Sequence, residues 1–526
     1  MTGLLLALLV TATAAGAVLG GLSGAVAPVA VAGGAWALGK APLRWTAAAL
    51  LAAVLTLEVS SDTDGHWHTP LVALGDLLAE NLDASLHVPG AKLSGLEVVL
   101  LALLAVGAWR RGEAARVDGR WAGQVGWTKW TGWTRWTGWR ASAERTPERA
   151  MEARTARVVP DAVLLFLGCV AYAVVRGLAR GGSVDIAILH VRPLVRVGLF
   201  YGVFNFAFAG RADHRLLGRV VVFAALVRAA LAVWIALFVR PVVAPEMIYA
   251  TNHGDSVLFS VACVLLLADL AEHADRRRLL QALLLLPPLF AGMVANNRRL
   301  AWVMLAFGVF AAFAAVPSRR AWKRGLALAG ALAAPLLAVY VAAGWGSTSQ
   351  AFAPVRVLQS LWDGTTDSST LYREIENWNL AMSMREDPLL GRGFGHTYTE
   401  YSRGADISSI FALYAAVPHN GVLGLLLFAG LFAFVGIWTA WVVGLYLAVR
   451  VARFARDPRD RVAALGCLGA LLSSCVLVYG DLGFAFVQTQ IALALALALV
   501  GKLAVATGAW SVALPVRGLP SRSAPA

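Results

Sequence analysis

The residues that could do chemistry in this chain are concentrated between Ser369 and Gly424, the most polar stretch of a very apolar sequence. Arg373 opens a helical run there, a glycine-rich segment follows, and His419 precedes the next apolar segment. Histidine is the side chain best suited to proton transfer near neutral pH, so His419 is a candidate general base. The alternative is structural: His419 or Asn420 caps the following helix by satisfying its free amide groups.

Three short motifs occur in order within this stretch: an arginine that begins a short helix, then DPLLGRGFG, then HNGVL. In this arrangement the chain resembles the O-antigen ligase and O-antigen polymerase family of bacterial membrane proteins. The family pattern is approximately R-x-x-I-W, then D-x-P-L-x-G-x-G-x-G, then H-N-x-x-L and a glycine-rich helix. The matching positions are Arg373–Trp378, Asp387–Gly395 and His419–Leu423, with the tryptophan of the first motif two places late.

The resemblance implies a membrane-embedded glycosyltransferase that needs no cofactor and no metal. Such an enzyme transfers a glycan, with inversion, from a polyprenyl (undecaprenyl) diphosphate carrier to an acceptor hydroxyl at the outer face of the bacterial cytoplasmic membrane. His419 would take the proton of that hydroxyl. If His419 is only a cap, the base is sought among Glu374, Glu376 and Asp387. A ligase uses a lipid-core or protein acceptor and a polymerase uses another carrier-linked glycan, and the sequence leaves both open.

Arginines are expected to bind the diphosphate of the donor, because a guanidinium pairs bidentately with phosphate and stabilises charge on the departing group. The family carries an S-R-G-A-W-like sequence at the start of the helix before the large loop. Here N-R-R-L-A-W places Arg299 at the matching position and Arg298 at that of the serine, so either is a candidate. Arg373 joins them from the loop itself. A further arginine is expected from an earlier helix, and the candidates are Arg192 and Arg196.

Composition places the elements that carry these residues in a membrane. The chain has 526 residues, of which 59% are hydrophobic and only 14% charged, which is more apolar than a soluble domain needs. We therefore expect an all-α polytopic membrane protein with about fourteen helices, and no fewer than about twelve. The apolar runs of spanning length lie near residues 3–20, 22–39, 44–59, 94–109, 158–176, 194–210, 217–239, 257–272, 279–296, 299–316, 324–343, 420–448, 462–480 and 484–505.

Basic loops alternate with these runs and set the expected orientation. The net charge of +14 comes from Lys and Arg in these loops, which mark the cytoplasmic side of a membrane protein. The basic segments are 110–157, 210–219, 272–278, 317–324 and 450–461. The segments expected outside are 60–93, 240–256 and 344–419.

The chain is accordingly divided into N-terminal helices (1–343), an external catalytic loop (344–419) and C-terminal helices with a short tail (420–526). The cytoplasmic loop 110–157 contains a tryptophan repeat with interspersed Lys and Arg, which favours contact with membrane lipids over nucleic acid. The residues expected to shape the external loop are Gly391, Gly393, Gly395 and Asn420.

Two other functions remain open from the sequence. Asp62 and Asp64 form a D-x-D in the first external loop, with His66 and His68 close by. This pattern looks like membrane glycosyltransferases that use polyprenyl-phosphate sugars, and the four side chains are of metal-binding types. A transporter of lipid-linked glycans would share the many-helix architecture but would form no glycosidic bond.

Overall fold

The computed structural model of this protein describes most of the chain. The described ranges are 40–59, 72–85, 92–117, 154–243, 249–317, 321–349, 368–404 and 413–511, with a few single residues outside them. Some predictions fall outside the described residues: the metal-type side chains Asp62, Asp64, His66 and His68, the tryptophan repeat, and most of the first two expected spans.

Regular structure in the described residues is helical, apart from isolated β-bridge residues such as the pair Asn81 and Ser94. Helices follow from the apolar sequence, because a backbone surrounded by lipid must satisfy its polar groups within the segment. The helices are α2 (Leu43–Thr56), α3 (Val72–Ala79), α4 (Leu82–Ser85), α5 (Gly95–Val117), α8 (Val158–Ala179), α9 (Val184–Ala207), α10 (His214–Trp234) continued by the π-helix η2 (Ile235–Val239) and α11 (Arg240–Val243), α12 (Gly254–His273), α13 (Arg276–Asn296), α14 (Arg299–Ala315), α15 (Ala321–Gly344), α17 (Ser368–Met384), α18 (Gly421–Phe454), α19 (Pro458–Gly480) and α20 (Val487–Ala506).

Eight of the described helices are long and apolar enough to cross a membrane. They are Val158–Ala179, Val184–Ala207, His214–Val242, Gly254–His273, Arg276–Asn296, Gly421–Phe454, Pro458–Gly480 and Val487–Ala506. The prediction of an all-α, multi-pass membrane protein is therefore confirmed. The count of fourteen spans stays a prediction.

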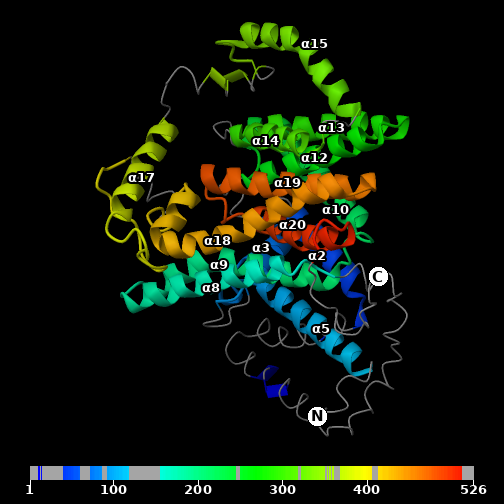
Figure 1. Cartoon of the computed structure of the whole chain (residues 1–526). Coiled ribbons are helices and arrows are strands. Elements are labelled where there is room, and N and C mark those ends of the chain that lie inside the picture. The colour runs from blue at the N-terminus through cyan, green and yellow to red at the C-terminus, as the bar shows by residue number, and fades with distance from the viewer. Residues whose placement is uncertain are drawn as a thin grey trace.

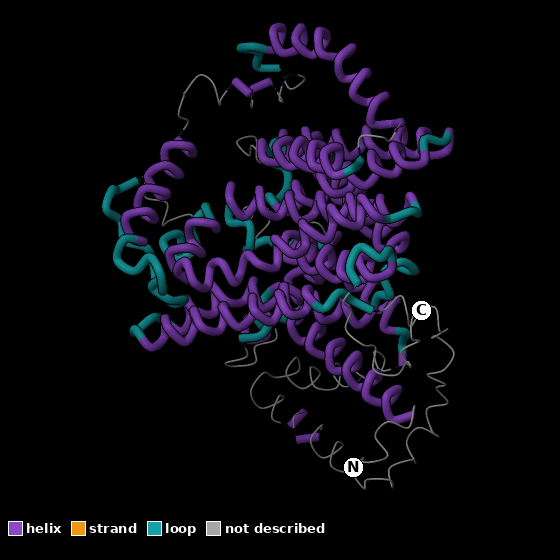
Figure 2. The backbone as a smooth tube through the Cα atoms, viewed as in Figure 1, coloured by secondary structure: helices purple, strands orange, loops and turns teal. Residues whose placement is uncertain are grey.

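Helices α19 and α20 form the centre of the bundle. α19 packs against α12, α14 and α18, while α20 packs against α9, α18 and α19. The long helices run roughly parallel, and the loops gather near their two ends (Figure 1, Figure 2). α17 lies across one of these ends, which we call the site end (Figure 1). We call the other the basic end.

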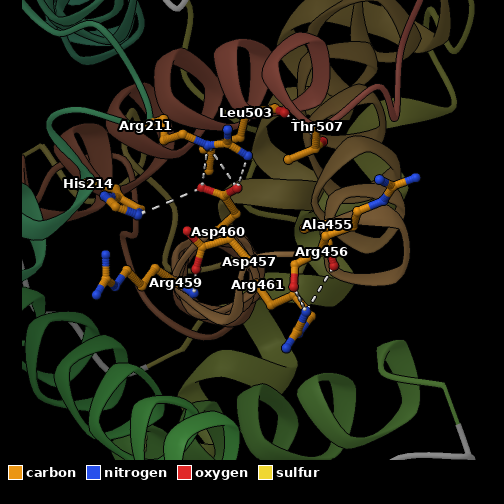
Figure 3. Close-up of polar contacts among 10 residues, drawn as sticks. All are labelled: Arg211, His214, Ala455, Arg456, Asp457, Arg459, Asp460, Arg461, Leu503 and Thr507. Carbon is orange, nitrogen blue, oxygen red and sulfur yellow. Dashed lines mark hydrogen bonds and ion pairs between the residues drawn. The ribbon is translucent and has the colours of Figure 1, made fainter.

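Ion pairs and a hydrogen bond from a buried lysine join segments that are distant in sequence at the basic end. Arg211, just before α10, binds the carboxylate of Asp460 on α19, with 3.0 Å from Nε to Oδ2 (Figure 3). Arg461 pairs with Glu272 at the end of α12, with 2.7 Å from Nε to Oε2. Lys502 of α20 donates to a carbonyl oxygen near the end of α9 at 2.7 Å. Because a buried charge needs a partner, these pairs fix the helix ends relative to one another.

Helix α9 begins at Val184, well before the apolar run 194–210 that the sequence indicates. The part of the helix that precedes this run contains Arg192, and Arg196 follows one turn later; both pair with Glu97 of α5, at 3.2 and 2.9 Å. Pairing lowers the penalty for charge at this depth, so the helix continues through residues that hydropathy would place in a loop.

Candidate active site at the site end

The glycine-rich segment is inserted into a break in α18. At Gly430 the backbone leaves the helical conformation, with φ 69° and ψ 168°. A break in a membrane helix frees amide and carbonyl groups, which must find partners elsewhere in the protein. Segment 388–393 supplies them through four backbone hydrogen bonds of 2.8–3.1 Å with residues 427–432.

Three glycines allow this insertion. Gly391, Gly393 and Gly395 have φ values of 75°, 89° and 105°, a region that other residues rarely adopt. A Cβ on Gly391 would clash with the backbone nitrogen of Gly430 in α18, and one on Gly393 would clash with the backbone of Gly177 in α8. Between the last two glycines, the amide of Phe394 donates to the carbonyl of Ala173 on α8 (2.8 Å). The segment therefore lies wedged between α8 and α18.

Asp387 fixes the start of this segment. Its carboxylate binds Arg176 and Arg180 at the end of α8, with 2.7 Å to Nη1 of Arg180, and it accepts the amide of Leu390 (3.3 Å). Burial alone would raise the pKa of Asp387, but these hydrogen bonds outweigh it and lower the pKa. A carboxylate committed to two guanidinium groups is a structural anchor rather than a base.

His419 is held by Glu376 of α17. Oε1 of Glu376 lies 3.1 Å from Nδ1 of His419, and Oε2 accepts the backbone N–H of His419 at 2.9 Å. The carboxylate is buried, whereas the imidazole is 20% exposed and packs against the ring of Tyr372. No described residue hydrogen-bonds to Nε2 of His419. With Nδ1 held by the carboxylate, Nε2 is the ring nitrogen placed to accept a proton.

Asn420, next to His419, is the residue that caps α18. Its Oδ1 accepts the amide of Leu423 at 3.1 Å, and its Nδ2 donates to Asn377 of α17 at 3.1 Å. Of the two capping alternatives raised by the sequence, the structure gives this role to Asn420. The side chain of His419 is directed to Glu376 instead.

A second imidazole–carboxylate pair lies beside the first. Nε2 of His253, before α12, is 2.9 Å from Oδ2 of Asp481 at the end of α19. Nη2 of Arg373 is 3.2 Å from the same oxygen. The amide of Leu482 donates to the carbonyl of His419 at 2.8 Å, which joins the two pairs. The site end thus brings Arg373 and His419 together with two residues from other parts of the chain.

The protonation of this second pair follows from its surroundings. Burial lowers the pKa of His253, and its hydrogen bond to Asp481 only partly opposes this effect. Burial alone would raise the pKa of Asp481, but the hydrogen bond and charge of His253, with the charges of Arg373 and His419, lower it. At neutral pH His253 is therefore neutral and donates Nε2–H to an ionised Asp481. Its Nδ1, buried and without a hydrogen-bond partner among the described residues, is left as an acceptor.

Buried polar contacts position His253. Asn296, at the end of α13, accepts the amide and the hydroxyl of Thr251 at 3.1 Å each. Asp255, in the first turn of α12, pairs with Arg228 of α10 at 2.8 Å, and both side chains are buried. Truncating either partner would leave a buried charge, so this pair strongly constrains where α12 begins.

The two arginines of the turn between α13 and α14 lie in different environments. Asn297 adopts the left-handed conformation (φ 53°) and ends α13. Arg298 is half-buried, with its guanidinium carbon 3.3 Å from the ring centroid of Tyr249. Burial lowers the pKa of His253, and the charge of Arg298 lowers it further. Arg299 begins α14 and is exposed. Arg298 is therefore the one that acts electrostatically on the second pair.

Arg192 lies in a different cluster. It pairs with Glu97 at 3.2 Å and donates to the carbonyl of Lys92, and Arg196 binds the same carboxylate. Within the described residues, no hydrogen bond or ion pair joins either arginine to His419. Glu97 therefore occupies the two arginines that the sequence offers as additional diphosphate ligands.

Taken as chemistry, the site end offers an oriented imidazole, a buried acceptor nitrogen and several guanidinium groups within one polar cluster. Such a set can bind an anion and remove a proton beside it. Among the described residues, no group of three or more His, Cys, Asp or Glu could hold a metal ion.

Two residues of the cluster, His253 and Asp481, were not predicted from the sequence, and Glu376 was predicted only as an alternative base. A signal for the first two was present: T-N-H-G-D precedes one apolar run, and D-L-G follows another. Both are polar groups at the externally assigned end of a span, and they could have been grouped with His419 on that ground.

No protein-family model matches this chain, and no curated protein sequence matches it. The function is therefore inferred from the geometry of the site end.

Proposed function

We propose that this protein is a membrane glycosyltransferase of the O-antigen ligase or polysaccharide polymerase type. It transfers a glycan from a polyprenyl diphosphate carrier to an acceptor hydroxyl. The observation that carries the proposal is the Glu376–His419 pair, which lies beside Arg373, His253 and Asp481 at one end of a membrane bundle.

In the proposed reaction, the acceptor oxygen attacks the anomeric carbon from the face opposite the carrier. The new glycosidic bond forms as the bond to the diphosphate breaks, and the hydroxyl proton passes to Nε2 of His419. Glu376 stabilises the imidazolium that results, as a carboxylate does for a histidine base in other enzymes. General-base catalysis of this kind contributes typically ~10²–10⁴-fold in rate.

Arginines hold the diphosphate in this proposal and stabilise its charge as it departs. Arg373 and Arg298 lie in the cluster, where Asp481 and Glu376 offset their two charges. The exposed Arg299 lies next to Arg298 and adds a third guanidinium group to the cluster. We therefore assign donor binding to all three, with Arg192 left out because of its pairing with Glu97.

We place the site at the outer face of the bacterial cytoplasmic membrane. Support comes from the opposite end of the bundle, where the basic segments around Arg211 and Arg461 meet. Excess Lys and Arg mark the cytoplasmic side, so the site end then faces outward. Reporter fusions test this: a fusion after Gly404 should be external, and one after Ala274 cytoplasmic.

The experiment that tests the activity compares surface glycans of bacterial cells that carry the gene, lack it, or carry His419→Gln. Glutamine keeps a hydrogen bond to Glu376 but cannot act as a base near neutral pH. We expect His419→Gln to behave like the deletion. Loss of long chains with single units still attached indicates a polymerase, and loss of all attachment indicates a ligase.

His396→Gln provides the matched control, because His396 lies in the same loop but outside the cluster. Its Nε2 lies 3.2 Å from the carbonyl oxygen of Gly177. It should keep the parental glycan pattern at equal membrane levels. A parental pattern with His419→Gln would refute the role of His419 as base. Transfer abolished by a metal chelator would instead favour the metal-dependent alternative with Asp62 and Asp64, and normal glycans in the deletion strain would exclude any transferase.

A further inference from the structure

A histidine of α9, outside the cluster at the site end, binds the loop that leads to His419 at two points. His190 is half-buried, and its Nε2 lies 2.6 Å from the carbonyl oxygen of Ala416. Its Nδ1 accepts the amide N–H of Gly395 at 3.3 Å. Gly395 is the last of the three positive-φ glycines, and Ala416 precedes His419 by three residues. We call residues 394–398 and 413–417 the two loop arms, and one side chain of α9 holds both.

Backbone contacts support the same attachment. The carbonyl of Gly395 accepts the amide of Ser183, the residue before α9, at 2.8 Å. Both backbone polar groups of this glycine are therefore bound from α9 or its N-terminus. The amide of Tyr398 donates to the carbonyl of Ala415 at 2.9 Å, which joins the two loop arms directly.

Aromatic rings fix the orientation of the imidazole. His190 stacks on Phe428 of α18, with 4.5 Å between the ring centroids. Phe394 meets the same imidazole edge-on, with its centroid at 5.5 Å. An imidazole held between two rings presents its two nitrogens in fixed directions, so each nitrogen keeps its own backbone partner.

The two hydrogen bonds require a single protonation state of His190. A carbonyl oxygen only accepts, so Nε2 must carry the proton that Ala416 receives. An amide N–H only donates, so Nδ1 must offer a lone pair to Gly395. His190 is therefore the neutral Nε2–H tautomer. The proposed base His419 needs the opposite one, with Nδ1 facing Glu376 and Nε2 free to accept a proton.

We propose that His190 is a positioning residue for His419. By binding both loop arms to α9, it sets where the chain enters the turn that carries His419 and thus how Nε2 of His419 meets an acceptor hydroxyl. It acts at a distance, since in the described residues no hydrogen bond joins the two imidazoles. The inference rests on the proposed function, because it assigns His190 to the same transfer step.

Three variants of the full-length protein in detergent test this role. His190→Phe keeps a ring against Phe428 but removes both hydrogen bonds. His190→Gln offers one acceptor and one donor, as the neutral imidazole does. Val195→Phe, at an exposed position of the same helix, is the matched control. Hydrogen exchange of the loop arms should become about ten- to a hundredfold faster in His190→Phe, because two hydrogen bonds are lost.

Transfer kinetics separate positioning from a merely structural role. In His190→Phe the kcat should fall by about ten- to a hundredfold, because a displaced base is misaligned with the hydroxyl. The KM for the donor should stay near the parental value, because the arginines assigned to donor binding lie on α14, at its start, and on α17. His190→Gln should recover most of the kcat, and Val195→Phe should change neither quantity.

The tautomer can be measured in the parental protein itself. Its ¹⁵N NMR spectrum with labelled histidine should show His190 with Nε2 protonated and Nδ1 unprotonated at neutral pH, and loss of this signal in His190→Gln identifies it. The other tautomer or an imidazolium would overturn the proposal, and so would parental exchange or a parental kcat in His190→Phe that unfolds at the parental midpoint. Absence of transfer in the parental protein would instead refute the proposed function, and exchange with NMR would then still decide whether His190 fastens the loop.

Discussion

Replacing Gly177 with alanine tests how the glycine-rich loop is held in the bundle. A Cβ on Gly177 would lie 2.7 Å from both the amide nitrogen and the carbonyl carbon of Phe394. Cβ atoms essentially never approach other atoms closer than 3.0 Å. Both partners are backbone, so neither can rotate away, and the loop must move off α8. That movement breaks the hydrogen bond from the amide of Phe394 to the carbonyl of Ala173 (2.8 Å).

Three effects set the magnitude for Gly177→Ala. Overpacking costs about 1–3 kcal/mol of the free energy of unfolding. Loss of one backbone hydrogen bond costs about 0.5–1.5 kcal/mol. Alanine in a helix gains about 1 kcal/mol over glycine, which partly offsets both. The expected net destabilisation is therefore about 2 kcal/mol.

Gly168→Ala is the matched control, because Gly168 lies on the same helix and a Cβ there meets nothing within 4 Å. It should be neutral or stabilising by up to about 1 kcal/mol. The assay is the thermal unfolding midpoint of the full-length protein in detergent, with hydrogen exchange of segment 388–395 to locate the change. Equal midpoints and equal exchange for the two variants would show that the loop does not pack against α8 as described.

Three further predictions concern the cluster at the site end. Glu376→Gln should lower the rate of glycan transfer by roughly 10²–10⁴-fold at an unchanged level of protein in the membrane, because His419 loses the group that fixes its tautomer. Initial rates in isolated membranes check this, and a near-parental rate would contradict it. Arg298→Ala and Arg299→Ala should both weaken donor binding, more so for Arg298, which acts on His253; a larger rise of KM for Arg299→Ala would reverse the assignment. The pKa of His253 is lower in the folded protein than its usual value, so the unfolded chain binds the proton first as the pH falls. The free energy of unfolding that depends on His253 is therefore fully present above about pH 6.5 and decreases below it. His253→Gln should flatten this decline in the unfolding midpoint between about pH 6.5 and 5, and an unchanged pH profile would mean that His253 is not the titrating group.

The helices were the part of the fold most open to prediction from the sequence. Lipid leaves a spanning backbone little alternative to a helix, so an apolar run nearly determines the element. The rule failed at the start of α9, because the apolar run begins at residue 194 whereas the helix begins at Val184 and includes Arg192. Glu97, the partner of Arg192 and Arg196, lies on another helix, and no local pattern announces that pairing.

The candidate site was predictable only where its residues are close in sequence. Arg373, His419 and Asn420 stand out because they occur in one polar stretch with a recognisable order. His253 and Asp481 come from the ends of α12 and α19, and only the packing of those helices places them against Arg373. Whether His419 or Asn420 caps α18 also needed structure, since it depends on the direction of a side chain.

The docked glycine loop connects the fold of this protein to its site. In the sequence, Glu376 precedes segment 388–395 and His419 follows it, so the distance between the two side chains depends on where that segment is fixed. Hydrogen bonds to the broken helix α18 and to α8 fix it, and three positive-φ glycines make those contacts sterically possible. A loop held in this way loses little further entropy when a substrate binds, which favours a preorganised base over one assembled by the ligand. Gly177→Ala should therefore reduce glycan transfer as well as stability, although Gly177 touches neither His419 nor the arginines. If transfer were unaffected while exchange of segment 388–395 increased, the Glu376–His419 contact would be maintained by α17 and α18 alone.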